Sequence, residues 1–180
     1  SVLDAQANAV LQKAQRLGDK VAIGSHPPIK DELRIFPDSV PSLDQIGNPV
    51  IATVTPGEFE AASVVIWNDA PVQEMTVEIG ALKGDSGELL PDVVDARWVK
   101  CWYQANDSDI VPMSRVLIPE LLLKNPEMVK VDRAQEKNIL LDGYNGDETA
   151  RGYRDDSKTL LPIKQVDAKT STQAWLTIRV

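Results

Sequence analysis

Apolar residues at the start of the chain recur with the spacing expected of one face of an α-helix. They are Val2, Ala5, Ala9, Val10, Ala14 and Leu17, and Gln, Asn, Lys and Arg lie between them. Gly18 is a residue type that commonly ends a helix. The pattern predicts one amphipathic helix over 1–19, which packs on the body of the domain or connects it to a preceding one. A docking arm for a partner is the alternative.

After Gly18 the pattern changes to short runs of β-branched and aliphatic residues, separated by Pro, Gly, Asn and Asp. The runs are VAIG, ELRIF, VIATVTP, ASVVIWN, MTVEIGAL, DARWVKCWYQ, RVLIPELLL, MVKVD, NILLDG and AWLTIRV. About eight to ten short strands with turn residues between them predict an all-β domain over 20–180. We expect an antiparallel β-sandwich, immunoglobulin-like or jelly-roll-like, with one N-terminal helix. The absence of helical crossover patterns argues against a doubly wound α/β sheet.

The last third of the sequence suggests a domain truncated from a longer chain. The stretch DETARGYRDDSKTLLPIKQVDAKTSTQ is long and polar, as in a loop or linker. The sequence then stops at Val180, directly after the strand pattern AWLTIRV. Natural chains usually place a few polar residues after the last strand. We therefore expect the parent protein to continue beyond this point.

Charge and composition argue against several classes of function. The net charge of −8 disfavours nucleic acid and anionic membrane surfaces, both of which need clustered Lys and Arg. No stretch approaches the ~20 apolar residues of a membrane-spanning helix, so no membrane insertion is expected. A single cysteine and a single histidine argue against most zinc sites and against a Cys-His or Ser-His nucleophile.

The strand RWVKCWYQ carries the most informative aromatic pattern. Because side chains alternate along a strand, one face holds Trp98, Lys100 and Trp102, and the other holds Val99, Cys101 and Tyr103. Burying a lysine without a partner is costly, which assigns the second set to the core and the two tryptophans to the outside. Flat rings on an outer face suit the C–H faces of pyranose sugars. A contact with the helix or another domain, or a core position with the lysine reaching out to solvent, are the alternatives.

Of the two other tryptophans, one lies at the end of a predicted strand and one lies within a predicted strand. Trp67 follows an apolar run and precedes a turn, so it either caps the core or lines a carbohydrate-binding cleft. Trp175 alternates with Leu176 and could face another domain. His26, beside two prolines, is interpreted as a loop residue.

Acidic residues are plentiful in the predicted loops, but no pair of them stands out. A glycosidase needs two carboxylates about 5–10 Å apart, one with a raised pKa, and the sequence selects no such pair. The loop DGYNGDE has the composition of a calcium loop, with Asp142, Asn145 and Asp147 as weak candidate ligands. Its spacing departs from the EF-hand pattern. A structural calcium ion is the one cofactor that remains a hypothesis, and a tight hairpin is the alternative.

Several stretches resemble a known domain: VTPGEFEAASVVIWN, WVKCWYQA, LIPELLLKNPEMVKVD and STQAWLTIRV. They are similar to the N-terminal β-sandwich domain of large bacterial secreted proteins that carry a glycoside-hydrolase-like barrel further along. Relatives of the β-N-acetylgalactosaminidase type are among these proteins. The resemblance implies an accessory domain in front of a catalytic barrel. It supplies no catalytic residues, because the acidic pair of such hydrolases would lie in the barrel.

Three functional hypotheses follow. The first is a non-catalytic accessory domain that supports the catalytic domain or substrate cleft of a glycoside hydrolase downstream in the same chain, with a secreted, periplasmic or cell-surface location. The second is a free-standing carbohydrate-binding module whose ligand is an oligo- or polysaccharide. The third is an interaction module of a surface or phage assembly without a role in sugar binding.

Overall fold

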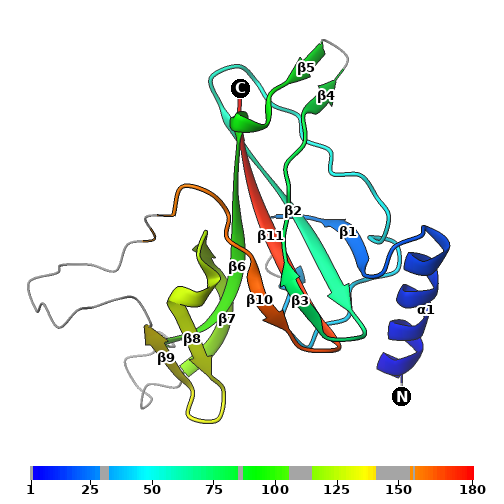
Figure 1. Ribbon diagram of the computed structural model, residues 1–180, viewed down its shortest axis with the longest axis vertical. Coiled ribbons are helices and arrows are strands. Elements are labelled where there is room, and N and C mark those ends of the chain that lie inside the picture. Colours follow the sequence, from blue (N-terminus) through cyan, green and yellow to red (C-terminus); the bar gives the residue numbers. More distant parts are fainter. Residues whose placement is uncertain (1, 29–32, 85–86, 106–114, 141–154, 156) are drawn as a thin grey trace, which may run out of the picture.

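The computed structural model describes residues 2–28, 33–84, 87–105, 115–140, 155 and 157–180. Within these residues one α-helix precedes a series of strands, and every strand pair is antiparallel (Figure 1). The fold is all-β with a single N-terminal helix, as the sequence pattern predicts. The main sheet has five strands, in the spatial order β1 (Ala22–His26), β2 (Phe59–Asn68), β11 (Thr170–Arg179), β6 (Val94–Ala105) and β7 (Arg115–Leu123).

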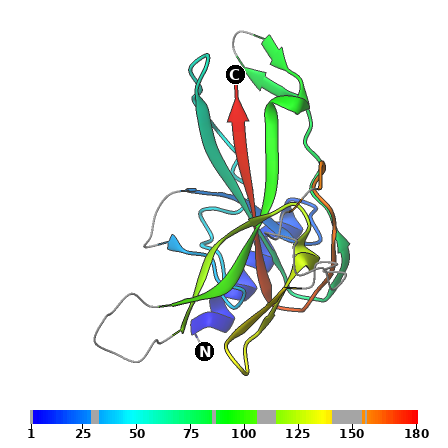
Figure 2. The ribbon, with the colours of Figure 1, turned by 90° about the vertical axis from the view of Figure 1, so that its left-hand side faces the viewer.

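Three two-stranded ribbons surround the main sheet. They pair β3 (Val72–Met75) with β10 (Ile163–Val166), β4 (Leu82–Gly84) with β5 (Gly87–Leu89), and β8 (Val129–Asp132) with β9 (Lys137–Leu140). Short 3₁₀ turns, η2 (Pro91–Val93) and η3 (Pro126–Met128), precede β6 and β8. The β8–β9 ribbon lies beside β6 and β7 (Figure 2), where Leu123 packs with Met128 and Val129.

The first face of the main sheet, here called the ribbon face, is covered by β3 and β10 (Figure 1). Ala174 of β11 lies opposite Trp98 of β6, and both pack with Ile66 of β2 against Met75 and Val166 of the ribbon. These residues occupy alternating positions of their strands, so they share the face that the ribbon covers. This cluster is the main core of the domain.

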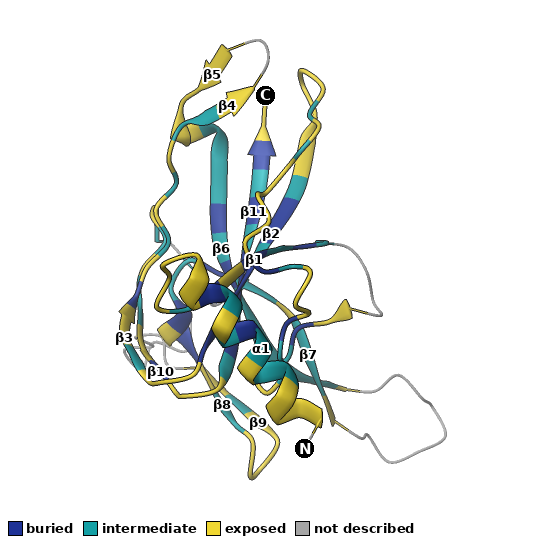
Figure 3. Cartoon of the chain, turned by 90° about the vertical axis from the view of Figure 1, so that its right-hand side faces the viewer, coloured by how far each residue is buried: buried dark blue, intermediate teal, exposed yellow. Residues whose placement is uncertain are grey.

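The opposite face, here called the helix face, is covered at one end by α1 (Val2–Arg16). Val10 and Ala14 of the helix are fully buried against Ala22, Ile46 and Trp67. Figure 3 shows the exposed positions of α1 on its outward side. The predicted helix and its packing on the body of the domain are thus confirmed. No helix among the described residues is long and apolar enough to cross a lipid bilayer.

A close backbone approach holds the segment 33–46 against the helix face. Gly24 of β1 forms an isolated bridge with Ile46, and a Cβ atom at this position would collide with the Gln45 carbonyl group. Glycine is therefore required at position 24 for steric reasons. Further along the same segment, the Ser39 carbonyl oxygen accepts a hydrogen bond from the Ser171 hydroxyl group at 2.8 Å. Together these contacts place the segment beside the middle of the main sheet.

Candidate functional site

Trp98 does not lie on an exposed outer face, so this part of the sequence prediction is wrong. Its side chain is 1% exposed and belongs to the ribbon-face core, and its indole N–H donates a hydrogen bond to the Leu161 carbonyl oxygen at 2.8 Å. Strand alternation correctly separates the two faces of β6. What it does not reveal is that β3 and β10 cover the face that carries the tryptophan.

Lys100 stays on the Trp98 side of β6 because its ammonium group finds a partner there. Lys100 Nζ donates a hydrogen bond of 2.6 Å to the Pro126 carbonyl oxygen, and the side chain is half-buried. Burial lowers the pKa of Lys100, and the charge of Glu127 opposes this shift. Trp102 is half-buried, and its indole N–H is enclosed without a hydrogen-bond partner among the described residues. The exposed pair of rings that would form a sugar platform on this strand is therefore not present.

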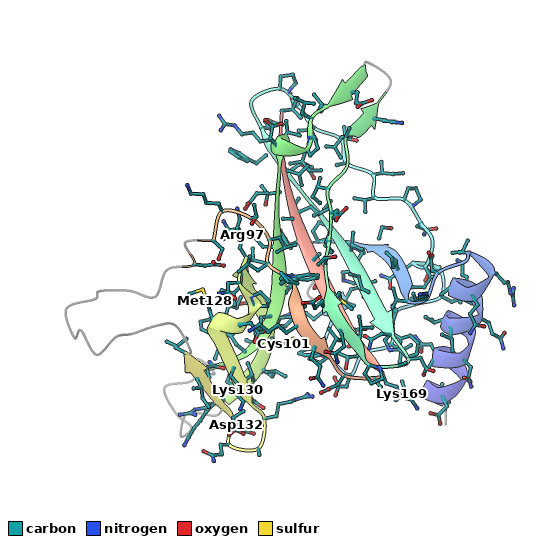
Figure 4. The ribbon with its side chains drawn as sticks, in the orientation of Figure 1. Arg97, Cys101, Met128, Lys130, Asp132 and Lys169 are labelled. Carbon is teal, nitrogen blue, oxygen red and sulfur yellow. The ribbon has the colours of Figure 1, made fainter. Side chains whose placement is uncertain are left out.

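The other face of β6 holds Cys101, which Figure 4 labels together with Arg97. The Cys101 thiol is half-buried and contacts the Ile35 carbonyl oxygen at 3.6 Å. Burial raises the pKa of this thiol to about 11, so it is protonated at neutral pH. Val99 and Tyr103 are half-buried as well. The predicted core position of these three residues is thus only partly realised, because each of them keeps part of its surface exposed.

Trp67 occupies the core between α1 and the sheet, 1% exposed, and does not line a cleft. This is the core alternative that its position at the end of an apolar run allows. The three candidate calcium ligands, Asp142, Asn145 and Asp147, lie outside the described residues. Within the described part of the chain, no group of three or more His, Cys, Asp or Glu side chains is arranged to hold a metal ion.

A groove opens on the helix face, next to the segment 33–46. It has a volume of about 270 Å³. Trp175 and Gln173 project into it from β11, which runs through the middle of the sheet. The remaining walls come from the end of β1 and the residues after it, from β6 and from β7: His26, Pro27, Pro28, Leu33, Arg34, Val99, Pro119, Glu120 and Leu122.

Buried polar side chains continue from the groove into the protein. Gln173 Nε2 donates to Ser63 Oγ at 3.0 Å, and Ser63 Oγ donates to the His26 carbonyl oxygen at 2.9 Å. The imidazole of His26 accepts from the Gln45 amide at 2.8 Å through Nδ1. Ser63, His26 and Gln173 are 1%, 6% and 7% exposed, so this network is shielded from bulk water. Each of its hydrogen bonds is accordingly stronger than it would be at the surface.

His26 is a buried strand residue, which corrects its interpretation as a loop residue. It ends β1 and pairs with Ser63 of β2. Burial lowers the pKa of His26, and a hydrogen bond with the Leu33 backbone partly offsets the shift. The neutral imidazole thus connects β1 to both ends of the segment that forms one wall of the groove, through Leu33 and Gln45.

Charged residues lie at the rim of the groove and on the neighbouring part of the sheet. Arg34 and Glu120 form an ion pair of 3.7 Å at its rim. Further along the same face, Arg97 Nε of β6 and Lys124 Nζ, just after β7, each lie 2.7 Å from a carboxylate oxygen of Asp95. Burial alone would raise the pKa of Asp95, but the hydrogen bonds and charges of Lys124 and Arg97 outweigh it and lower the pKa. This carboxylate is therefore ionised and held in place.

A second hollow of about 580 Å³ lies at the end of β6, where β7 and β9 begin, and several of its polar groups are paired with one another. Asn138 donates to the Tyr103 carbonyl oxygen and accepts from the Tyr103 amide, and Arg115 donates to the Glu136 carbonyl oxygen. The groove on the helix face is smaller, yet it combines an aromatic ring with a buried amide and charged side chains at its rim. We therefore consider it the better candidate site.

The groove is assembled from segments that lie far apart in the sequence, and the prediction missed it. One signal was present in the strand AWLTIRV and the residues before it. Ala174, Leu176 and Ile178 form an apolar row, whereas Gln173, Trp175 and Thr177 form the alternate row. An aromatic ring between two polar side chains is unusual for a core face and indicates a binding surface.

A scan against protein-family models and a search of curated proteins each found no match.

Proposed function

We propose that this chain is a non-catalytic accessory β-sandwich domain of a carbohydrate-active protein, and that the groove around Trp175 binds a saccharide. The observation that carries the proposal is the adjacent placement of Trp175 and Gln173 in one groove. An indole ring offers a flat apolar surface to the C–H groups of a pyranose, and a buried amide pairs with its hydroxyl groups. Such combinations of apolar lining and a few placed polar groups are typical of ligand sites.

The size of the groove supports a small contact area. Its volume of about 270 Å³ lies just below the range for ligand pockets, which is roughly 300–1,000 Å³. This space suits one sugar ring within a longer chain. Charged side chains at the rim, such as Arg34 and Glu120, can reach the neighbouring rings through hydrogen bonds.

The carboxylates near the groove favour binding over hydrolysis. Glu120 is the one carboxylate among the groove-lining residues that are described, whereas glycoside hydrolysis needs two. Asp95, on the neighbouring strand, has a lowered pKa, which is the opposite of what a general acid requires. Catalysis would then belong to a downstream domain of the same chain, as the resemblance to secreted hydrolase-like proteins implies. A secreted, periplasmic or cell-surface location is part of the same proposal.

Isothermal titration calorimetry with neutral tetrasaccharides tests this proposal. We expect at least one of cellotetraose, xylotetraose, mannotetraose and chitotetraose to bind. Replacing Trp175 by Ala should weaken that binding by about 1–3 kcal/mol, the value of burying one large apolar side chain. Phe59→Ala is the matched control, because Phe59 is an aromatic residue that is 65% exposed outside the groove. Equal affinity of the wild type and Trp175→Ala, or no binding by any tetrasaccharide, would contradict the proposal.

A further inference from the structure

Gln173 is a buried amide whose surroundings are largely apolar. On the neighbouring strands it lies between Val65 of β2 and Val99 of β6. The side chain is 7% exposed and lines the groove, and its one hydrogen bond within the described residues is the one to Ser63. A glutamine in such a position has two polar ends, and the direction in which each points decides what the groove can recognise.

Hydrogen-bond chemistry determines that direction. The Ser63 hydroxyl has a single hydrogen, and it is directed at the His26 carbonyl oxygen, which can only accept. Ser63 Oγ can therefore only accept from Gln173, which places Nε2 of the amide at the serine. With the opposite amide orientation, two acceptors would face each other without a proton between them. The carbonyl end, Oε1, consequently points away from Ser63.

The Oε1 atom of Gln173 can still accept hydrogen bonds. Within the described part of the chain no donor reaches it, and it is not among the buried atoms that are sealed from solvent. An acceptor in contact with solvent is available to a ligand hydroxyl group, which can donate to it in place of water. Trp175 is two positions further along the same strand and on the same face, at a distance of roughly 7 Å. One sugar ring can contact both side chains at once.

From this arrangement we infer that Gln173 is a specificity-determining residue: its Oε1 accepts a hydrogen bond from a hydroxyl group of the neutral sugar ring that stacks on Trp175. Ser63 acts as a positioning residue, because it holds the amide in the accepting orientation. A sugar that lacks this hydroxyl, or that places an acceptor such as a carboxylate there, would be bound less well. The inference rests on the proposed function and names the group of the ligand that the site reads.

The test uses the intact chain and the tightest binder among cellotetraose, xylotetraose, mannotetraose and chitotetraose, together with its monodeoxy analogues. For the wild type, we expect one analogue to bind roughly 5- to 100-fold more weakly than the parent sugar. Gln173→Met, which keeps the side-chain length but removes the acceptor, should bind the parent sugar and that analogue equally. Ser63→Ala should reduce the discrimination between the two sugars while the contact with Trp175 remains. Gln165→Met is the matched control, since Gln165 is an exposed residue of β10 outside the groove.

The outcomes separate this inference from the proposed function. If a tetrasaccharide binds through Trp175 but Gln173→Met keeps the wild-type discrimination, the inference is overturned and the proposed function stands. If every monodeoxy analogue binds the wild type as well as the parent sugar does, the inference is overturned as well. This comparison uses the wild-type protein alone, so it does not depend on whether a variant folds. If no tetrasaccharide binds, both are overturned. Thermal unfolding of each variant shows whether a loss of binding reflects a loss of structure.

Discussion

Trp175 on β11 lies directly opposite Arg97 on β6, on the helix face of the main sheet. Arg97 is held by Asp95, which also binds Lys124, so an ionised triad borders the ring on one side. The groove with Gln173 borders it on the other. The aromatic ring thus lies between a fixed charged group and a buried amide, although β6 and β11 are far apart in the sequence.

The Asp95 triad should contribute modestly to stability. Replacing Asp95 by Asn should lower the free energy of unfolding by about 0.5–1 kcal/mol, because the carboxylate is 38% exposed and its ion pairs are screened by solvent. Its lowered pKa means that this contribution is present above the ordinary value of 3.8 and is lost as the pH falls below it. Urea unfolding at low and high salt measures the effect. Asp92→Asn in η2 is the control, and an effect that grows with salt would contradict the explanation.

Trp98 should behave as a core residue. Trp98→Ala should destabilise the fold by about 3–5 kcal/mol, since it empties a site that is 1% exposed. Trp98→Phe keeps most of the packing but removes the hydrogen bond to the Leu161 carbonyl oxygen, so a loss of about 1–3 kcal/mol is expected. Denaturant unfolding gives both values. A Trp98→Ala protein that is as stable as the wild type would show that the ring is not packed beneath β3 and β10.

Stability should depend on pH through His26, the single histidine of the chain. Because burial lowers its pKa in the folded state, the unfolded chain binds a proton at a higher pH than the folded one. Stability should therefore be fully present above about pH 6.5 and fall as the pH drops below that value. Melting temperatures between pH 8 and pH 5 test this expectation. His26→Gln should flatten the profile in this window, and an unchanged profile in the variant would assign the effect to other groups.

Cys101 should react slowly with thiol reagents. Its pKa of about 11 lies two units above the ordinary value of 9.0, so the thiolate fraction at pH 8 is on the order of a hundredfold lower than for a free cysteine. Labelling with a chromogenic disulfide should be correspondingly slow in the native protein and fast in denaturant. A Cys101→Ser variant serves as the blank. Native labelling at the rate of an unfolded chain would show that the segment 33–46 does not cover the thiol.

The amphipathic helix and the strands were predictable because their information is local. The spacing of Val10 and Ala14 indicates the buried side of α1, and both residues are indeed fully buried. The β-branched runs around Val65 and Ile178 likewise become strands of the main sheet. Helical and extended backbones impose repeats of 3.6 and 2 residues on any buried face, so the repeat can be recognised without knowing the partner.

Which face of a strand is buried could not be predicted in the same way. Alternation places Trp98 and Lys100 together, and the cost of burying a lone ammonium group then favours an exposed face. The structure supplies two things that the local pattern lacks: the β3–β10 ribbon over Trp98, and the Pro126 carbonyl oxygen that binds Lys100. Strands β3 and β10 come from 72–75 and 163–166, so their pairing is a long-range event.

By itself the sequence determined the order, type and periodicity of the elements, and in the alternate rows of β11 it already separated Gln173 and Trp175 from the apolar core positions. Only the tertiary structure decided that Trp98 and Trp67 are enclosed while Trp175 borders a groove. The physical reason is that burial is a property of surfaces brought together from distant segments, whereas backbone periodicity is a property of neighbouring residues. A hydrogen-bond chain such as Gln173–Ser63–His26, which joins three strands, exists only after those strands have paired.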